Sequence, residues 1–233
     1  MRKSFPVCVV LLLSFLLASC SSDTRRLMVP YNHVTSAHLI GPAGWHADNE
    51  RRCLASGQVR ESRFIRQRAS LGTPVGCGAE RPFVITALNG GHVALTPAAT
   101  LRCPMVRPVE AWLQNVVQPA ARRYLNTSVV RLKVAASYAC RSRNNKPGAK
   151  LSEHGRANAL DVSAFHLADG SVVSIKGNWR DFGSSGRFLR ATHSGACRHF
   201  STVLGPDADR HHHDHLHLDL ARHGRDGRHR VCR

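Results

Sequence analysis

Two separated segments carry side chains that could bind one metal ion together. The first, SEHGRANALD, contains His154 and Asp161, which are seven positions apart. The second, HHHDHLHLDL, contains His215 and His217. Two imidazoles and one carboxylate would leave a fourth tetrahedral position for water, as in catalytic rather than structural zinc sites. Such a metal makes water nucleophilic near neutral pH and polarises a carbonyl group.

The second segment has the alternation of a β-strand over residues 216–220. Residues two apart on a strand face the same way, so we expect His215, His217 and Asp219 to project to one side. His212 lies in the approach to this strand. The sequence therefore predicts a strand face that offers imidazoles to a cation.

The first segment fits a loop that turns into a strand near Ala159, so that two segments could approach one cation. A different interpretation is also open. A histidine run such as His211–His213 can be a solvated surface that binds metal only incidentally. The two interpretations differ in whether the histidines have distinct roles.

The rest of the chain predicts the elements that would position these residues. Residues 82–96 have the pattern of two strands around Asn89-Gly90-Gly91. Apolar residues at helical spacing follow Pro108 as far as Tyr124, which predicts a helix bent at Pro119. Further expected elements are strands over 129–138, 159–165, 171–175 and 216–220, and a helix over 188–200. We expect one α+β domain, with a small antiparallel sheet that carries the zinc site and is flanked by helices.

The N-terminus has the pattern of an export signal. Basic residues precede the apolar run 7–17, which is too short to span a bilayer. The run ends in Leu17-Ala18-Ser19-Cys20, which resembles a bacterial lipobox. Cys20 would then become the mature N-terminus and carry the lipid, and Ser21 after it favours the outer membrane. An ordinary signal peptide cleaved nearby is the alternative.

These features divide the chain into three parts. Residues 1–20 are interpreted as a lipoprotein signal peptide, residues 21–47 as a flexible tether, and residues 48–233 as the folded domain. A hydrophobic content of 42% is sufficient for a buried core. No segment after the signal is long and apolar enough to cross a membrane.

The cysteines fit an exported protein. Apart from Cys8 and Cys20, six remain, at positions 53, 77, 103, 140, 197 and 232. An even number in an exported protein predicts disulfides, and here we expect three. None forms a C-x-x-C pair, which disfavours a thiolate zinc site. The connectivity stays open at this point.

The formal charge of +18 predicts attraction to polyanions. Nucleic acid would be the first candidate, but export to the cell envelope removes it as an expected partner. Peptidoglycan is a polyanion in the compartment that the signal predicts.

The two histidine segments resemble the signatures of the lysostaphin, D-Ala-D-Ala metallopeptidase and sonic hedgehog superfamily. Within it, the chain is similar to the bacterial extensin-like C-terminal domain family from about Cys53 to Ala221. The similar segments, in family order, are SYACRSRN, SEHGRANALDVSAF, ADGS, FLRATHSGACRHF, VLGPD and DHLHLDL.

The resemblance implies three zinc ligands, namely His154, Asp161 and His217. It implies that His215 handles protons or steadies the transition state, and that His212 is an auxiliary histidine. Arg141 would face the substrate and bind a carboxylate or a developing oxyanion. It could equally be one surface arginine among many.

Other residues of the first segment have structural interpretations. Ser152 is expected to organise the loop before the first histidine. Glu153 is expected to face solvent, although a Glu beside a ligand is also a possible base. Relatives carry glycine where this chain has Ala157, and its glycine is Gly155 instead. If that position needs a positive φ, alanine strains the loop by about 1 kcal/mol or more.

The function implied is a zinc metallopeptidase, anchored by lipid in a Gram-negative envelope, that cleaves peptide bonds of peptidoglycan. An endopeptidase is slightly preferred over a D,D-carboxypeptidase. The alternative is a non-catalytic wall-binding module with the same fold. A third hypothesis is a polyanion-binding protein that uses the arginine-rich segments 51–68 and 222–233.

Overall fold

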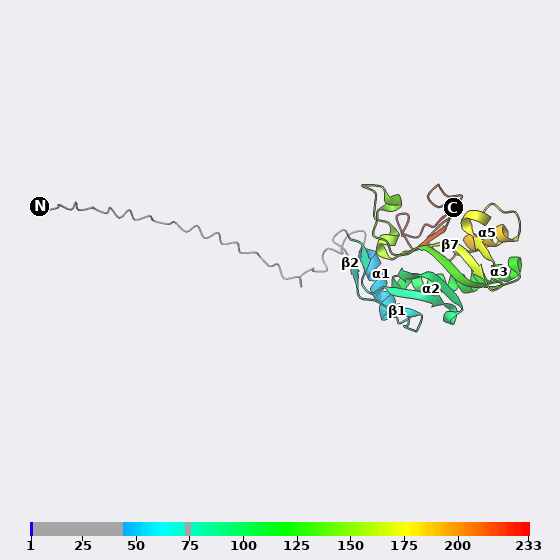
Figure 1. Ribbon diagram of the computed structural model, residues 1–233, viewed down its shortest axis with the longest axis horizontal. Coiled ribbons are helices and arrows are strands. Elements are labelled where there is room, and N and C mark those ends of the chain that lie inside the picture. The colour runs from blue at the N-terminus through cyan, green and yellow to red at the C-terminus, as the bar shows by residue number, and fades with distance from the viewer. Residues whose placement is uncertain (2–43, 73–75) are drawn as a thin grey trace. The chain divides into compact units, whose positions relative to one another are not determined.

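The computed structural model describes Met1 and residues 44–72 and 76–233 (Figure 1). Apart from Met1, the predicted signal peptide with the lipobox cysteine Cys20 lies outside the described residues, as does most of the predicted tether. Helix α1 spans Gly44–Ala55, whereas the sequence predicted irregular chain as far as Ala47. The expected boundary at residue 48 therefore falls inside a helix.

A mixed sheet of nine strands forms the centre of the folded region. Its strands are β1 (Ile65–Gln67), β4 (Phe83–Leu88), β5 (Val93–Leu101), β6 (Val129–Ala136), β7 (Ala159–Leu167), β8 (Val172–Ser174), β9 (Thr202–Leu204), β10 (Leu216–Asp219) and β11 (Val231–Cys232). The order is β1-β4-β5-β6-β7-β10-β9-β11, and β8 also pairs with β7. The described strands β2 (Leu71–Gly72) and β3 (Gly78–Ala79) form a separate small sheet.

The α+β class is confirmed, but the expectation of a small antiparallel sheet is wrong. Strands β5 and β6 are parallel, as are β9 and β11. Parallel neighbours need a crossover connection, and a helical segment between β5 and β6 provides it. The predicted hairpins β4–β5 and β7–β8 are both antiparallel pairs, as expected.

The helical crossover begins earlier than the sequence predicted. It consists of α2 (Cys103–Trp112), a π-helical turn (Leu113–Val117) and α3 (Gln118–Leu125). Pro104, rather than Pro108, lies in the first turn, and Pro108 lies inside α2. The departure from α geometry comes directly before Pro119, whose missing N–H removes one hydrogen bond from the helix.

Two further helices, α4 (Ile175–Asn178) and α5 (Ser184–Ala196), follow the β7–β8 hairpin (Figure 1). Helix α5 corresponds to the helix predicted over 188–200, but it begins and ends four residues earlier. The indole of Trp112 donates a hydrogen bond of 3.0 Å to the carbonyl of Thr192, which ties α2 to α5. Phe165 of β7 contacts both helices, through Trp112 and Phe188. The helices and the sheet therefore share one core.

A β-bulge in β7 changes which residues of this strand point into the core and which point to the opposite face of the sheet. Val134 of β6 is opposite Val162, but its neighbour Lys133 is opposite Ala164, so Ser163 is the extra residue. The side-chain alternation reverses at such a bulge. Phe165 can therefore point into the core although Asp161, an even number of residues away, points to the other face.

Three disulfides join the described segments, which confirms the expected number. They are Cys53–Cys103, Cys77–Cys140 and Cys197–Cys232. The first ties α1 to α2, and the last ties the segment after α5 to β11. Within residues 44–72 and 76–233, no helix has both the length and the apolarity needed to cross a bilayer.

Candidate metal centre

Strands β7 and β10 place Asp161 and His217 directly opposite each other in antiparallel register. The flanking apolar residues of both strands belong to the core. The alternation that the sequence predicted for β10 therefore separates leucines on the core side from polar residues on the other. Asp161 is 3% exposed and His217 is 8% exposed, so both are removed from bulk water.

His154 is held by a short 3-10 turn, η5 (Glu153–Arg156), just before β7. The hydroxyl of Ser152 accepts a hydrogen bond from the backbone N–H of His154, which confirms the structural role expected for this serine. The His154 ring nitrogen Nδ1 lies 2.6 Å from the carbonyl oxygen of Ser137. A carbonyl oxygen can only accept, so Nδ1 carries the hydrogen and Nε2 presents its lone pair to the site.

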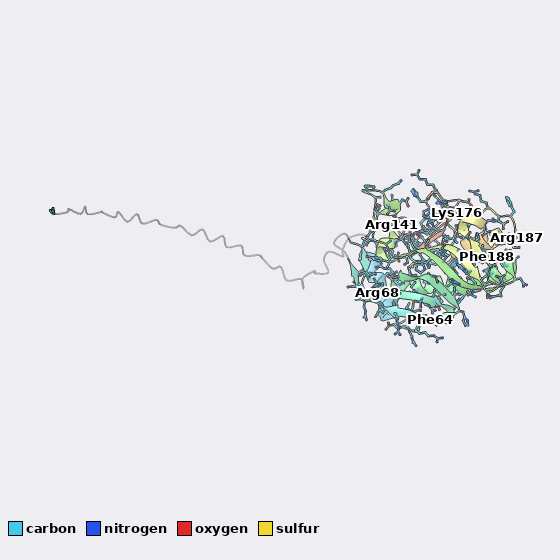
Figure 2. All side chains as sticks on the ribbon, viewed as in Figure 1. Phe64, Arg68, Arg141, Lys176, Arg187 and Phe188 are labelled. Atoms are coloured by element: carbon cyan, nitrogen blue, oxygen red, sulfur yellow. A yellow bond between two sulfur atoms is a disulfide. The ribbon has the colours of Figure 1, made fainter. Side chains whose placement is uncertain are left out.

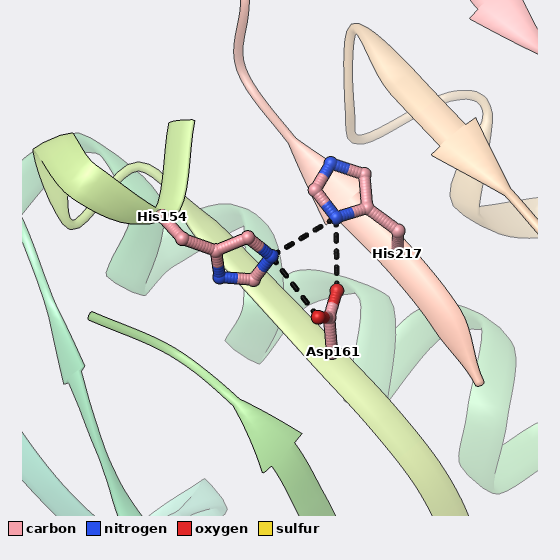
Figure 3. Close-up of side chains that lie close together, drawn as sticks. All are labelled: His154, Asp161 and His217. Atoms are coloured by element: carbon pink, nitrogen blue, oxygen red, sulfur yellow. Dashed lines mark hydrogen bonds and ion pairs between the residues drawn. The ribbon is translucent and has the colours of Figure 1, made fainter. Parts of the chain in front are cut away.

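Three electron-pair donors converge at this point (Figure 3). His154 Nε2 lies 3.0 Å from Asp161 Oδ2 and 3.2 Å from His217 Nδ1, and His217 Nδ1 lies 2.8 Å from Asp161 Oδ1. Bonds of about 2.0–2.1 Å to a tetrahedral zinc ion place neighbouring donor atoms about 3.3 Å apart. The observed spacing fits such an ion after a small expansion. The three residues thus form a group that could hold a metal ion.

The second nitrogen of His217 is also fixed. His217 Nε2 lies 2.9 Å from Asp219 Oδ2, and the other oxygen of Asp219 accepts a hydrogen bond of 2.9 Å from the N–H of Ala221. Metal-binding histidines usually donate their outer N–H to a carboxylate or a carbonyl in this way. The sequence placed Asp219 on this face, and the structure shows that it orients His217.

Within this buried group, the carboxylate of Asp161 and the imidazole of His217 shift each other's pKa values. Burial alone would raise the pKa of Asp161, but the close contacts of its carboxylate with the rings of His154 and His217 outweigh burial and hold the pKa well below its usual range. Burial would likewise lower the pKa of His217, but hydrogen bonds to Asp161 and Asp219 raise the pKa to about 10. In the metal-free protein, a proton on His217 therefore occupies the position that a cation would take.

The other two histidines predicted for the site lie beside this group. His215 precedes β10, its Nδ1 lies 2.9 Å from Asp214 Oδ1, and its Nε2 lies 3.6 Å from Asp161 Oδ2. The ring of His212 is centred 5.6 Å from that of His217, and its Nδ1 lies 2.8 Å from Asp209 Oδ1. In both rings a carboxylate fixes Nδ1 as the donor and leaves Nε2 as the free nitrogen.

A cavity of about 350 Å³ opens over these residues. Its lining includes the three candidate ligands together with Arg141, His212 and His215. Within the described ranges, no ion pair engages the guanidinium of Arg141. The structure therefore brings every predicted site residue to one cavity.

The expectation that Glu153 faces solvent is wrong. Glu153 is 8% exposed, and its Oε2 accepts hydrogen bonds of 2.8 Å from His46 Nε2 and 2.6 Å from Asn158 Nδ2. His46 belongs to α1, within residues 21–47, for which the sequence predicted a flexible tether. No local pattern links two residues 107 positions apart.

Ala157 occupies the position at which a glycine was expected. Its φ of 52° and ψ of 28° are left-handed, so this position does require a positive φ. Gly155 meets a different need, because a Cβ there would lie 2.8 Å from Leu151 Cδ1 and 3.2 Å from Cys77 Sγ. The chain therefore carries backbone strain directly after the turn that holds His154.

Comparison with known proteins gives one positive result. Residues 51–233 match the family model described as "Extensin-like protein C-terminus". No curated protein and no solved structure matches the chain. The matched region contains the sheet and all the residues of the candidate metal centre. The chain therefore belongs to the extensin-like protein C-terminus family.

Proposed function

We propose that the protein is a zinc-dependent peptidase of the lysostaphin, D-Ala-D-Ala metallopeptidase and sonic hedgehog superfamily, and that it hydrolyses peptide bonds of peptidoglycan. The observation that carries the proposal is the convergence of His154 Nε2, His217 Nδ1 and Asp161 in a cavity that also holds an imidazole outside the ligand group. A purely structural zinc site would use four protein ligands, whereas this group supplies three.

Zinc bound by these three residues would lower the pKa of a water molecule and polarise the substrate carbonyl. The chain's own groups supply the remaining parts of the chemistry. Asp214 keeps the hydrogen of His215 on Nδ1, so Nε2 can accept a proton at the cavity and later donate it to the leaving amine. Arg141 would bind a substrate carboxylate or the developing oxyanion. His212, whose Nδ1 is held by the carboxylate of Asp209, would act as an auxiliary histidine beside the ligand group.

The net charge supports peptidoglycan as the substrate. Peptidoglycan carries carboxylates, and a charge of +18 attracts such a polymer. Exposed basic residues lie in separate parts of the fold, for example Arg68 directly after β1, Lys176 on α4 and Arg187 on α5 (Figure 2). Basic residues spread in this way favour attraction to an extended anionic network. A nucleic-acid-binding protein would more often gather them in a single basic stripe. We prefer an endopeptidase, because an enzyme anchored by lipid meets a continuous network.

A non-catalytic wall-binding module is the second candidate, and the left-handed Ala157 favours it. Strain of about 1 kcal/mol beside His154 would weaken a metal site that depends on that turn. The carboxylate held against His215 Nδ1 argues for catalysis, because binding alone does not require an oriented imidazole beside the metal.

The proposal is tested by digesting purified peptidoglycan with the mature protein and identifying the products by mass spectrometry. We expect new stem-peptide ends with zinc present and none after a chelator, with activity restored by added zinc. Binding to peptidoglycan without any new ends, for the zinc-loaded protein and cross-linked substrate, would favour the binding module.

A further inference from the structure

A second cavity, of about 430 Å³, adjoins the metal cavity. Glu153 and Arg143 line both cavities, so the two share a wall. The remaining lining comes from α1 and from segments around η5 and after β10. Its residues are Trp45, His46, Lys150, Leu151, Arg156, Ala221 and Arg222.

Cations dominate this second cavity. Arg143, Lys150, Arg156 and Arg222 line it, and Glu153 is the one carboxylate among its lining residues. That carboxylate is already occupied by two buried hydrogen bonds. Among the described residues, none of the four cations forms an ion pair within 4 Å. Among its described lining residues, the cavity therefore has an excess of positive charge that Glu153 offsets only in part.

The cavity also has a flat apolar side. The guanidinium of Arg222 lies over the ring of Trp45, 5.7 Å from its centre, and the ring of His46 stacks on that of Trp45 with the ring centres 3.7 Å apart. Leu151 and Ala221 add apolar surface. An organic group with a carboxylate matches this combination better than a small inorganic anion, because both the apolar side and the charged rim would be covered.

We propose that the second cavity is a subsite for a carboxylate group of the stem peptide, beside the bond that the metal centre cleaves. The inference rests on the proposed function for the identity of the substrate. Free carboxylates on the stem would be bound by the arginines and Lys150, whereas amidation of that carboxylate would remove the attraction. The chain would thereby prefer stems whose acidic residue is not amidated.

The test measures binding separately from hydrolysis. The probe is a soluble stem tripeptide with a free α-carboxylate on its glutamate, compared with the same peptide amidated at that group. Binding of each to the zinc-loaded mature protein is measured by calorimetry, and cleavage of cross-linked peptidoglycan by the same protein preparations is followed separately by mass spectrometry. Wild type, Lys150→Gln/Arg222→Gln and the control Arg225→Gln are compared. Arg225 is exposed and lines neither cavity.

We expect wild type to bind the free acid about tenfold more tightly than the amide. The double variant should lose most of this preference, Arg225→Gln should keep it, and Arg222→Lys should retain much of it. Equal binding of the two peptides by wild type, or an equal loss in Arg225→Gln, would overturn the subsite. A preference for the acid without turnover of cross-linked peptidoglycan would leave the subsite standing and contradict the peptidase.

Discussion

At the scale of single residues, His217 connects the metal group to the rest of the protein. Both of its ring nitrogens have carboxylate partners, Asp161 on the cavity side and Asp219 on the outer side. The outer carboxylate fixes which nitrogen carries the hydrogen, so the inner nitrogen is available to a cation. The arrangement makes the properties of His217 depend on Asp219.

Replacing Asp219 should therefore weaken the site without removing a ligand. Asp219→Asn keeps the shape but can no longer accept the hydrogen bond as a charged group, and we expect zinc affinity to fall about 10- to 100-fold. Competition with a chromogenic chelator measures this affinity. Asp226→Asn, in an exposed turn, is the control and should bind zinc like wild type. Unchanged affinity in Asp219→Asn would contradict the orienting role.

The pKa of His217 predicts how the metal-free protein responds to pH. Its pKa is about 10 in the folded chain, above the ordinary value of 6.5 expected after unfolding. A raised folded pKa contributes stability that is fully present below about pH 6.5 and is lost as the pH rises through 10. In the presence of a chelator, the midpoint temperature of thermal unfolding should therefore decrease as the pH is raised from 7 to 10. His217→Gln should show a shallower fall, and an identical slope in the two proteins would contradict the assignment.

At the scale of elements, the sequence predicted those features that have a regular period or a distinctive turn. The alternation LHLD predicted β10 and its polar face, and the turn Asn89-Gly90-Gly91 predicted the β4–β5 hairpin. Pro119 indicated where the helical crossover departs from α geometry, but the bulge at Ser163 has no such sequence pattern. His46 and Glu153 meet only through the tertiary fold, so no local signal could have paired them.

The turn η5 carries a prediction about strain. Ala157→Gly relieves the strain of the left-handed backbone, which should stabilise the fold by about 1 kcal/mol. It also removes a buried methyl group, which should destabilise the fold by about the same amount. Ala164→Gly, buried in β7 without a positive φ, loses the methyl group and gains no relief. We expect Ala157→Gly to be about 1–2 kcal/mol more stable than Ala164→Gly in denaturant unfolding. Equal destabilisation of the two would mean that Ala157 is not strained.

At the scale of the whole molecule, the three disulfides agree with the prediction of an exported protein. The lipobox lies outside the described residues, so the anchor stays a prediction from sequence. Such an anchor would limit the proposed peptidase to the part of the wall within reach of the membrane.

The mature protein should carry lipid on Cys20 and partition with outer-membrane fractions. Cys20→Ala should be released in soluble form or remain unprocessed. Fractionation followed by mass spectrometry of the mature N-terminus measures both. Soluble wild-type protein with a different mature N-terminus would contradict the anchor.

The central claim is that His154, Asp161 and His217 bind the metal while His215 acts beside it, and metal content tests it most directly. Zinc per chain is measured by elemental analysis for wild type, His217→Ala and His215→Ala, each beside a peptidoglycan digestion. We expect about one zinc in wild type and in His215→Ala, but little in His217→Ala, because His217 belongs to the proposed ligand group and His215 does not. His215→Ala should lose about two to four orders of magnitude in rate while keeping its zinc. Equal zinc loss in the two variants, or zinc retained by His217→Ala, would contradict the account.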